Sequence, residues 1–179
     1  TAQIAKLHVA PESVFHFDQY LPGSSRNPRE MADNCRGLFE EKTDKPFFLY
    51  FCPSDPHRGG GVDKSFPGKH KPDLFGNLPN KKSRKGVKEV FYDPADVIVP
   101  PFLPDTPESR AELSQYYQSC SRIDDGLGRL IELLKETGQW DNTILIYTAD
   151  HGMAFPGAKT TVYEAGLRVP FIVRDPRSK

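Results

Sequence analysis

The chain has 179 residues, long enough to bury a hydrophobic core in one domain. Its 24 basic and 24 acidic residues cancel, so no overall field argues for nucleic acid or an anionic membrane surface as a partner. No run reaches the roughly 18 apolar residues of a membrane span, and the first residues lack the layout of a signal peptide.

Strand-like and helix-like segments alternate along the chain. Residues 1–5 are short and compatible with a β-strand, and the apolar runs at 46–52 and 142–149 are bounded by turn residues. Continuous apolar runs of this length are typical of strands that are covered on both faces, as in a parallel sheet. Residues 169–174 are a weaker candidate. We predict that the runs at 46–52 and 142–149 are neighbouring central strands.

The clearest helix is expected over residues 106–137. Thr106 can cap its N-terminus, Pro107 fits the first helical position, and Gly138 is a natural stop. Apolar residues recur along it at steps of three and four: Leu113, Tyr116, Cys120, Ile123, Leu127, Leu130 and Leu134. A second helix is expected over residues 31–41. This alternation predicts an α/β architecture with a central, largely parallel sheet flanked by helices.

Residues 59–95 break this pattern and are rich in glycine, proline and lysine. From Lys64 to Lys88 there are eight lysines or arginines and one acid, Asp73. Such a run is either a solvated surface loop or a wall that attracts an anionic substrate, because a local basic cluster raises ligand concentration even on a neutral protein. Long loops without regular structure are uncommon unless they are functional or disordered.

Polar side chains follow three of the predicted strands. They are Lys6 and His8 after the first, Asp55, His57 and Arg58 after the second, and Asp150 and His151 after the third. In parallel α/β sheets the ligand crevice lies beyond the carboxyl ends of the strands. Each group alone has a structural explanation, as a surface pair, an Asx turn or a strand end, but three groups at equivalent positions favour a shared site.

The chemistry of these groups suits a cation and an oxyanion. A carboxylate beside an imidazole, followed by Gly152, can form half of a divalent-cation site. Two lysines and two histidines nearby would donate hydrogen bonds to sulfate or phosphate. A nucleophile is missing, because Cys52 ends an apolar strand and is interpreted as a packing residue. The other cysteines, Cys35 and Cys120, are too distant in the sequence to suggest a zinc ribbon or a disulfide scaffold.

The segment YTADHGMAFPGAKTTVYEAGLRVPFIVR, residues 147–174, resembles the sulfatase family. Members carry Asp-Asn-Gly or Asp-His-Gly at a strand end, then Lys or Arg, then a glycine-containing segment that leads to Arg-Val-Pro. AKLHVAPESVFHFDQY, PFFLYFCPSDPHR and YDPADVIVPPFLPDTPESRAELSQYYQSCSRIDDGLG stand in the order of the heparan N-sulfatase branch. The resemblance implies an alkaline-phosphatase-like α/β domain that hydrolyses sulfate esters or sulfamates on sulfated, glycosaminoglycan-type sugars.

The resemblance also implies catalytic roles. Lys6 and His8 match a Lys-x-His that faces the nucleophile and the sulfate group. His57 matches a histidine that contacts the sulfate and protonates the leaving group, which suits a side chain with a tunable pKa. Lys159 matches a basic residue that binds the sulfate oxygens, and Arg58 is assigned to substrate binding beside it.

For the cofactors, Asp150 matches a calcium-ligating aspartate, and His151 stands where an asparagine is usual. The resemblance implies one divalent cation, calcium rather than zinc, although imidazole is an unusual calcium ligand and suits zinc better. The family's formylglycine, made within Cys/Ser-x-Pro/Ala-x-Arg, is expected upstream of residue 1. The whole chain, 1–179, is therefore expected to be an internal portion of one catalytic domain, without the nucleophile-bearing segment and the C-terminal part, and inactive alone.

Two other functions stay open. In two-metal phosphodiesterases and phosphatases of the same superfamily Asp-His-Gly ligates zinc, although Lys6, His8 and Lys159 stand where such enzymes place further metal ligands. The second alternative is a non-catalytic domain that binds sulfated glycans through the basic loop. For a sulfatase, the resemblance implies a sulfated carbohydrate as partner, with neither nucleic acid nor membrane. It also allows a homodimer of the intact enzyme and a secreted, periplasmic or lysosomal location.

Overall fold

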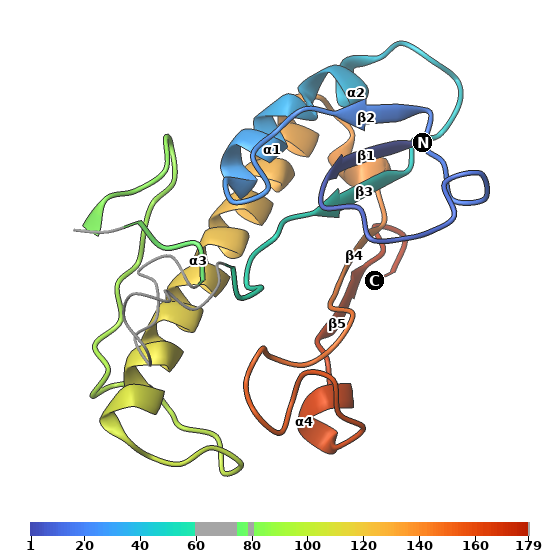
Figure 1. Ribbon diagram of the computed structural model, residues 1–179. Coiled ribbons are helices and arrows are strands. Elements are labelled where there is room, and N and C mark those ends of the chain that lie inside the picture. The colour runs from blue at the N-terminus through green and yellow to red at the C-terminus, as the bar shows by residue number, and fades with distance from the viewer. Residues whose placement is uncertain (60–74, 79–80, 179) are drawn as a thin grey trace.

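The computed structural model describes residues 1–59, 75–78 and 81–178, so the lysines and arginines of the basic run are described only from Lys81 onward. Figure 1 shows the elements in chain order: β1 (Ala2–Ala5), β2 (Gln19–Leu21), α1 (Pro28–Asn34), α2 (Arg36–Glu40), β3 (Leu49–Cys52), α3 (Pro107–Glu136), the 3-10 helix η2 (Trp140–Asn142), β4 (Leu145–Thr148), α4 (Glu164–Leu167) and β5 (Phe171–Arg174). Within the described residues no helix is both long and apolar enough to span a membrane.

The strands form two separate sheets. β1 lies between β2 and β3 in a parallel sheet of order β2-β1-β3, and β4 pairs with β5 in an antiparallel ribbon. The prediction that the runs at 46–52 and 142–149 are neighbouring central strands is therefore wrong on both points, because β3 lies at an edge of its sheet and β4 belongs to a two-stranded ribbon. An apolar run identifies a strand, but it carries no information about which strand it pairs with. The strand β2 was not predicted, because its three residues have no apolar run around them.

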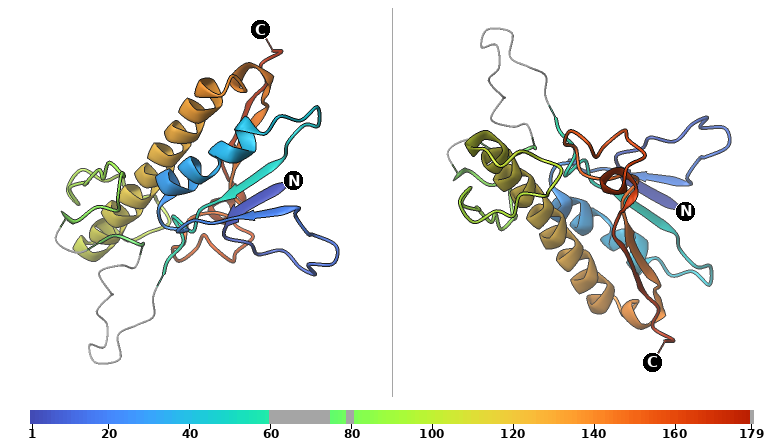
Figure 2. Two further views of the ribbon diagram at one scale, coloured as in Figure 1. Left: turned by 90° about the horizontal axis from the view of Figure 1, so that it is seen from above. Right: turned by 90° about the horizontal axis from the view of Figure 1, so that it is seen from below.

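The three longer helices pack on one side of the parallel sheet (Figure 2). Their contact with β1 forms a core of buried residues: Ile4, Met31, Ala32, Cys35, Phe39, Leu130, Leu133 and Leu134. This arrangement confirms the α/β architecture. The helix predicted over residues 31–41 is instead two helices, because α1 ends at Asn34 and α2 starts at Arg36, with Cys35 between them.

Helix α3 follows the sequence signals closely. The Thr106 hydroxyl accepts a hydrogen bond from the Ser109 amide at 3.2 Å, Pro107 is the first helical residue, and Gly138 has a left-handed φ of 73° just beyond the end. The predicted apolar stripe forms only part of the buried surface. Arg122 and Gly126 are also buried, on a face that contacts α1 and the loops around it.

The close approach of α1 and α3 at Gly126 makes a testable prediction. A Cβ at residue 126 would lie 2.2 Å from the Pro28 Cβ and 2.7 Å from its carbonyl carbon, whereas a Cβ at Gly128 meets nothing within 4 Å. Replacing a helical glycine with alanine normally stabilises by about 1 kcal/mol. We expect Gly128→Ala to raise the free energy of unfolding by up to that amount. Gly126→Ala is expected to lower it by about 1–3 kcal/mol, as overpacking does.

Chemical denaturation of the two variants beside the parent protein measures both values. Equal stabilisation by Gly126→Ala and Gly128→Ala would contradict the packing of α1 on α3.

Candidate active site

A cavity of about 2520 Å³ is lined by both β3 and β4, the strands that the sequence suggested would be neighbours. Helix α3 contributes Tyr116, Cys120 and Leu127 to its wall. Six predicted site residues line this one cavity: Lys6, His8, His57, Asp150, His151 and Lys159. The structure thus brings together side chains from both ends of the chain, whose individual roles stay predictions.

Three of the basic groups lie close enough to influence one another. Lys6 follows β1 and its amide donates to the Cys52 carbonyl at 2.9 Å, which extends the pairing of β1 with β3. Partial burial lowers the pKa of His57, and the positive charges of Lys159, Lys6 and Arg26 lower it further. The His57 imidazole is therefore biased towards its neutral form until an anion enters and offsets these charges.

Asp150, just after β4, lies close enough to β3 to influence Tyr50 and Cys52. A hydrogen bond with Cys52 and partial burial raise the pKa of Tyr50 to about 12, and the Asp150 charge adds to the effect. Burial raises the pKa of the Cys52 thiol, although Tyr50 and Lys6 oppose the rise. Cys52 is thus mainly an uncharged thiol, a poor nucleophile, which agrees with its interpretation as a packing residue.

The Asp150 and His151 side chains adjoin each other, with the Asp150 Oδ1 3.5 Å from the His151 Nε2. The His151 Nδ1 lies 2.8 Å from the Gly152 carbonyl oxygen. Among the described residues, no three His, Cys, Asp or Glu side chains are grouped so that they could hold a metal ion. Because calcium takes six to eight oxygen ligands, this pair fits one side of a coordination shell and cannot complete it.

The loop after β4 is folded back so that Lys159 returns to the cavity. Gly152 donates to the Gly166 carbonyl at 2.9 Å, and a Cβ at Gly152 would lie 1.8 Å from the Ala165 carbonyl oxygen, so only glycine fits there. The Lys159 amide donates to the Met153 carbonyl at 3.1 Å. The neighbour of Lys159, Thr160, has a left-handed φ of 66°, a costly conformation that concentrates at functional sites.

The turn that carries His57 is anchored on both sides. Before it, the Asp55 carboxylate accepts from the Arg122 Nε at 2.9 Å and pairs with Arg26 at 2.5 Å. Arg58, which follows it, donates to the Ala154 carbonyl at 2.6 Å and pairs with Glu112.

The guanidinium carbon of Arg58 also lies 4.7 Å from the ring centroid of Phe75 and 4.8 Å from that of Phe155. Protein groups thus surround much of the Arg58 guanidinium, and its assignment to substrate binding stays a prediction.

The expectation that this chain contains no formylglycine motif is wrong at the level of sequence, because residues 54–58, Ser-Asp-Pro-His-Arg, match the pattern Ser-x-Pro-x-Arg. The Ser54 hydroxyl lies 2.8 Å from the Ser25 hydroxyl, and the Ser54 amide donates to the Ser25 carbonyl at 2.7 Å. Arg58 is held by its own partners, as described above. These contacts favour a structural role for Ser54 in joining the turn to the loop before α1.

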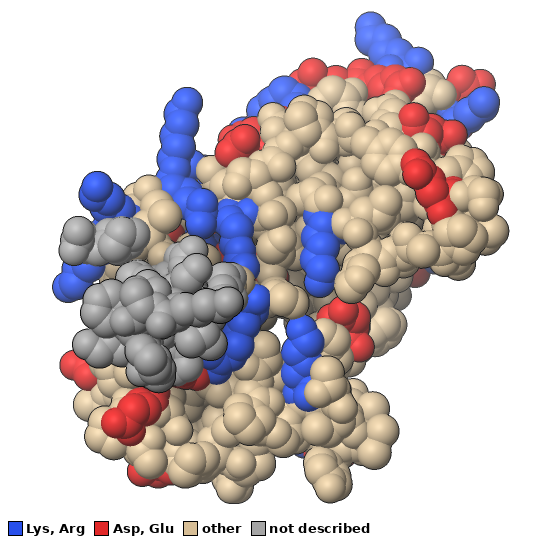
Figure 3. All heavy atoms as spheres, in the orientation of Figure 1, with Lys and Arg blue, Asp and Glu red and all other residues tan. Residues whose placement is uncertain are grey.

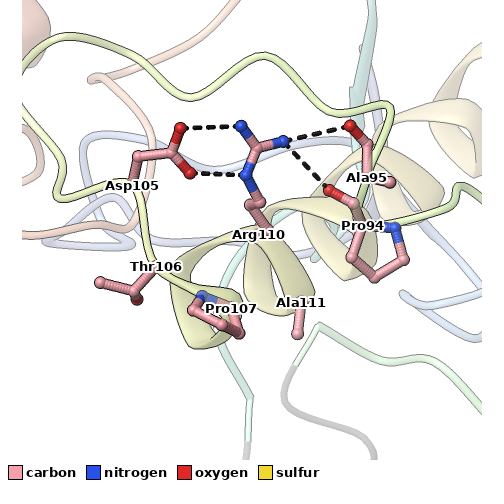
Figure 4. A pocket seen from close by; sticks show the side chains of 7 residues that line it. All are labelled: Pro94, Ala95, Asp105, Thr106, Pro107, Arg110 and Ala111. Atoms are coloured by element: carbon pink, nitrogen blue, oxygen red, sulfur yellow. Dashed lines mark hydrogen bonds and ion pairs between the residues drawn. The ribbon is translucent and has the colours of Figure 1, made fainter.

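The basic side chains are not spread evenly. Figure 3 shows lysine and arginine gathered across the middle of one face, around a hollow. A second, smaller hollow of about 460 Å³ lies at the start of α3 (Figure 4). There Arg110 pairs through both Nε and Nη2 with Asp105, at 2.5 and 2.7 Å, and donates to the Ala95 carbonyl at 3.1 Å. Because Arg110 and Asp105 pair with each other, we interpret these charged residues as structural and the hollow as part of the fold.

Comparison with known proteins identifies the chain's relatives. The family model described as Sulfatase matches residues 12–179. N-sulphoglucosamine sulphohydrolase of Homo sapiens is 32% identical over 98% of this chain and 36% of its own length. An arylsulfatase of Volvox carteri is 31% identical over 90% of this chain and 31% of its own length.

An ulvan-active sulfatase of Formosa agariphila is 26% identical over 74% of this chain and 25% of its own length. A solved protein of Bacteroides fragilis, assigned to the sulfatases, superposes with a TM-score of 0.51 at 22% identity, over 84% of this chain and 31% of its own. At that identity the likeness concerns the fold alone. The chain therefore spans between a quarter and just over a third of the length of these relatives.

Proposed function

The chain belongs to the sulfatase family, and we propose that the full-length protein hydrolyses sulfate esters or N-sulfates of sulfated sugars, of the glycosaminoglycan type. The observation that carries the proposal is the convergence of Lys6, His57 and Lys159 on the cavity that also holds Asp150. Sulfate transfer needs a cation on one side of the tetrahedral group and fixed positive donors on the other. This cavity offers the positive donors, and in Asp150 it offers a carboxylate that could hold the cation.

In the proposed mechanism, Lys6 and Lys159 bind the sulfate oxygens and stabilise the charge that develops on them in the transition state. His8 lines the same cavity and would face the nucleophile. His57 protonates the leaving oxygen or nitrogen. A bound sulfate would offset the positive charges that lower the His57 pKa, and so would favour the protonated imidazole that a general acid needs.

The proposed mechanism also needs a nucleophile and further ligands for the cation. We assign the nucleophile to a formylglycine outside residues 1–179, since Cys52 is an uncharged thiol and Ser54 is tied to Ser25. A bound calcium would polarise the sulfate group. Asp150 and His151 would hold one side of that ion, and further oxygen ligands would come from the same outside portion, so residues 1–179 alone should be inactive.

Sulfate release by the full-length protein tests the proposed function. We would assay N-sulfated and O-sulfated glycosaminoglycan disaccharides as substrates, and phosphate monoesters and diesters as alternative substrates in parallel. Release of sulfate from either sugar supports the proposal, and the ratio of the two rates gives the linkage preference. Phosphate-ester hydrolysis without sulfate release would instead support the two-zinc alternative. Binding of the sugars without turnover would support a glycan-binding domain.

For His57, we expect His57→Ala to lower kcat by about 10²–10⁴-fold on substrates with poor leaving groups, the usual contribution of a general acid. Aryl sulfates with strongly acidic phenols need no protonation of the leaving oxygen, so the loss on these substrates should be much smaller. Steady-state rates on a series of phenyl sulfates measure the difference. An equal loss along the whole series would remove His57 from the role of general acid.

A further inference from the structure

A fully buried arginine lies in the middle of α3. Arg122 has no exposed surface, and each nitrogen of its guanidinium donates a hydrogen bond. The acceptors are the Asp55 Oδ2 at 2.9 Å, the Asn77 Oδ1 at 2.6 Å, the Glu89 Oε2 at 3.2 Å and the Phe75 carbonyl at 2.7 Å. Arg122 therefore joins α3 to the turn that carries His57 and to the loop segments at 75–77 and 89.

Asp55 is the point at which this network reaches the cavity. Its carboxylate is fully buried, with Arg122 on one oxygen and the Arg26 Nη1 on the other at 2.5 Å. Two residues later, the His57 amide donates to the Ser54 carbonyl at 2.9 Å and closes the turn. The backbone on which His57 stands is thus held by one guanidinium from α3 and one from the loop before α1.

A contribution to folding stability does not by itself explain the buried Arg122 network. Taking Arg122, Asp55 and Glu89 out of water is costly, and buried ion pairs are often no more stabilising than apolar side chains of the same volume. What such a network does provide is a fixed geometry, since a guanidinium presents its donors in a rigid planar fork. A general acid needs such a support, because it must stay within hydrogen-bond reach of the leaving atom.

We propose that Arg122 and Arg26 act through Asp55 as positioning residues for His57. The proposal rests on the proposed function, because it concerns the leaving-group step assigned to His57. Neither arginine is among the residues that line the cavity. Their substitution should therefore impair protonation of the leaving group while substrate binding is kept.

The test uses the full-length protein with Arg26→Gln, Arg122→Lys and Arg122→Ala, and Arg129→Gln as the matched control. Arg129 lies on the same helix, two turns on, and pairs with Asp33, Glu132 and Glu136 at the surface. We expect Arg26→Gln and Arg122→Ala to lower kcat by about tenfold or more on poor leaving groups, with KM nearly unchanged, as misplacement of a catalytic group does. Arg122→Lys should restore part of the loss, and Arg129→Gln should behave as the parent.

A double-mutant cycle separates positioning from a general loss of structure. In the His57→Ala background, Arg26→Gln should have no further effect on kcat, since the group that it positions is gone. If the two losses multiply while His57→Ala is impaired as expected, the positioning proposal is wrong and the proposed function stands. If His57→Ala is fully active, His57 is not the general acid and the positioning proposal falls, whereas the proposed function is decided separately by whether the parent protein releases sulfate. Should Arg122→Ala fail to fold, Arg26→Gln still tests the positioning of His57, because Arg26 is partly exposed.

Discussion

In the full-length protein, Lys159→Ala is expected to lower kcat/KM for sulfated substrates by about 10²–10³-fold, the usual cost of removing one preorganised donor to a developing oxyanion. Lys159 lines the cavity, and its charge is close enough to lower the pKa of His57. In a partly dehydrated site such a charge acts on the transition state more strongly than in water. Steady-state kinetics on an N-sulfated and an O-sulfated sugar measure the loss.

Lys82→Ala is the control for Lys159. Lys82 belongs to the basic loop, is exposed, and stands outside the cavity lining. Its loss should act mainly through KM and fade as the salt concentration rises, because exposed charges are screened over about 10 Å at 0.1 M salt. Undiminished activity in Lys159→Ala would remove Lys159 from the site. A salt-dependent KM effect in both variants would reduce Lys159 to a general attractor of anions.

The local elements could be predicted from the sequence because their signals are local. Thr106, Pro107 and Gly138 mark the two ends of α3, and the apolar runs mark β3 and β4. Sheet pairing could not be predicted in the same way. Which strand lies beside β3 depends on contacts between segments far apart in the sequence, and the run at 46–52 contains nothing that prefers β1 over β4.

That the candidate residues share one cavity could also be predicted from local signals, whereas their roles stay predictions. Polar residues that follow the carboxyl ends of strands mark the ligand crevice of a parallel α/β sheet. Lys6, His57 and Asp150 line one cavity although β4 lies outside the parallel sheet, in an antiparallel ribbon. The Arg122 network that holds the turn carrying His57 was not predicted. Arg122 interrupts the helical periodicity of α3 with a charge on a buried face, and this was the available signal, since a buried arginine needs partners. Asp55, noted in the turn, is one of those partners.

The second large effect is expected at the proposed cation. Asp150→Ala should remove the bound metal from the full-length protein and lower kcat by about 10³-fold, since a metal ion supplies several kcal/mol of charge stabilisation in the transition state. The Asp150 carboxylate is 74% exposed beside His151, free to meet an ion in the cavity. Metal content measured by plasma mass spectrometry, together with kcat, gives both results. Asp141→Ala is the control, because Asp141 precedes the same strand at its other end and is 93% exposed beside Arg174.

His151→Asn distinguishes the two metals. Calcium prefers oxygen ligands, so an amide oxygen in place of the imidazole should keep or strengthen calcium binding. Zinc prefers nitrogen and sulfur ligands, and the same change should weaken it. We expect calcium in the parent protein and a metal content near the parent's in His151→Asn. Zinc in the parent, lost in His151→Asn, would overturn the calcium assignment and favour a two-metal phosphatase, whereas full activity and metal content in Asp150→Ala would remove Asp150 from the cation site altogether.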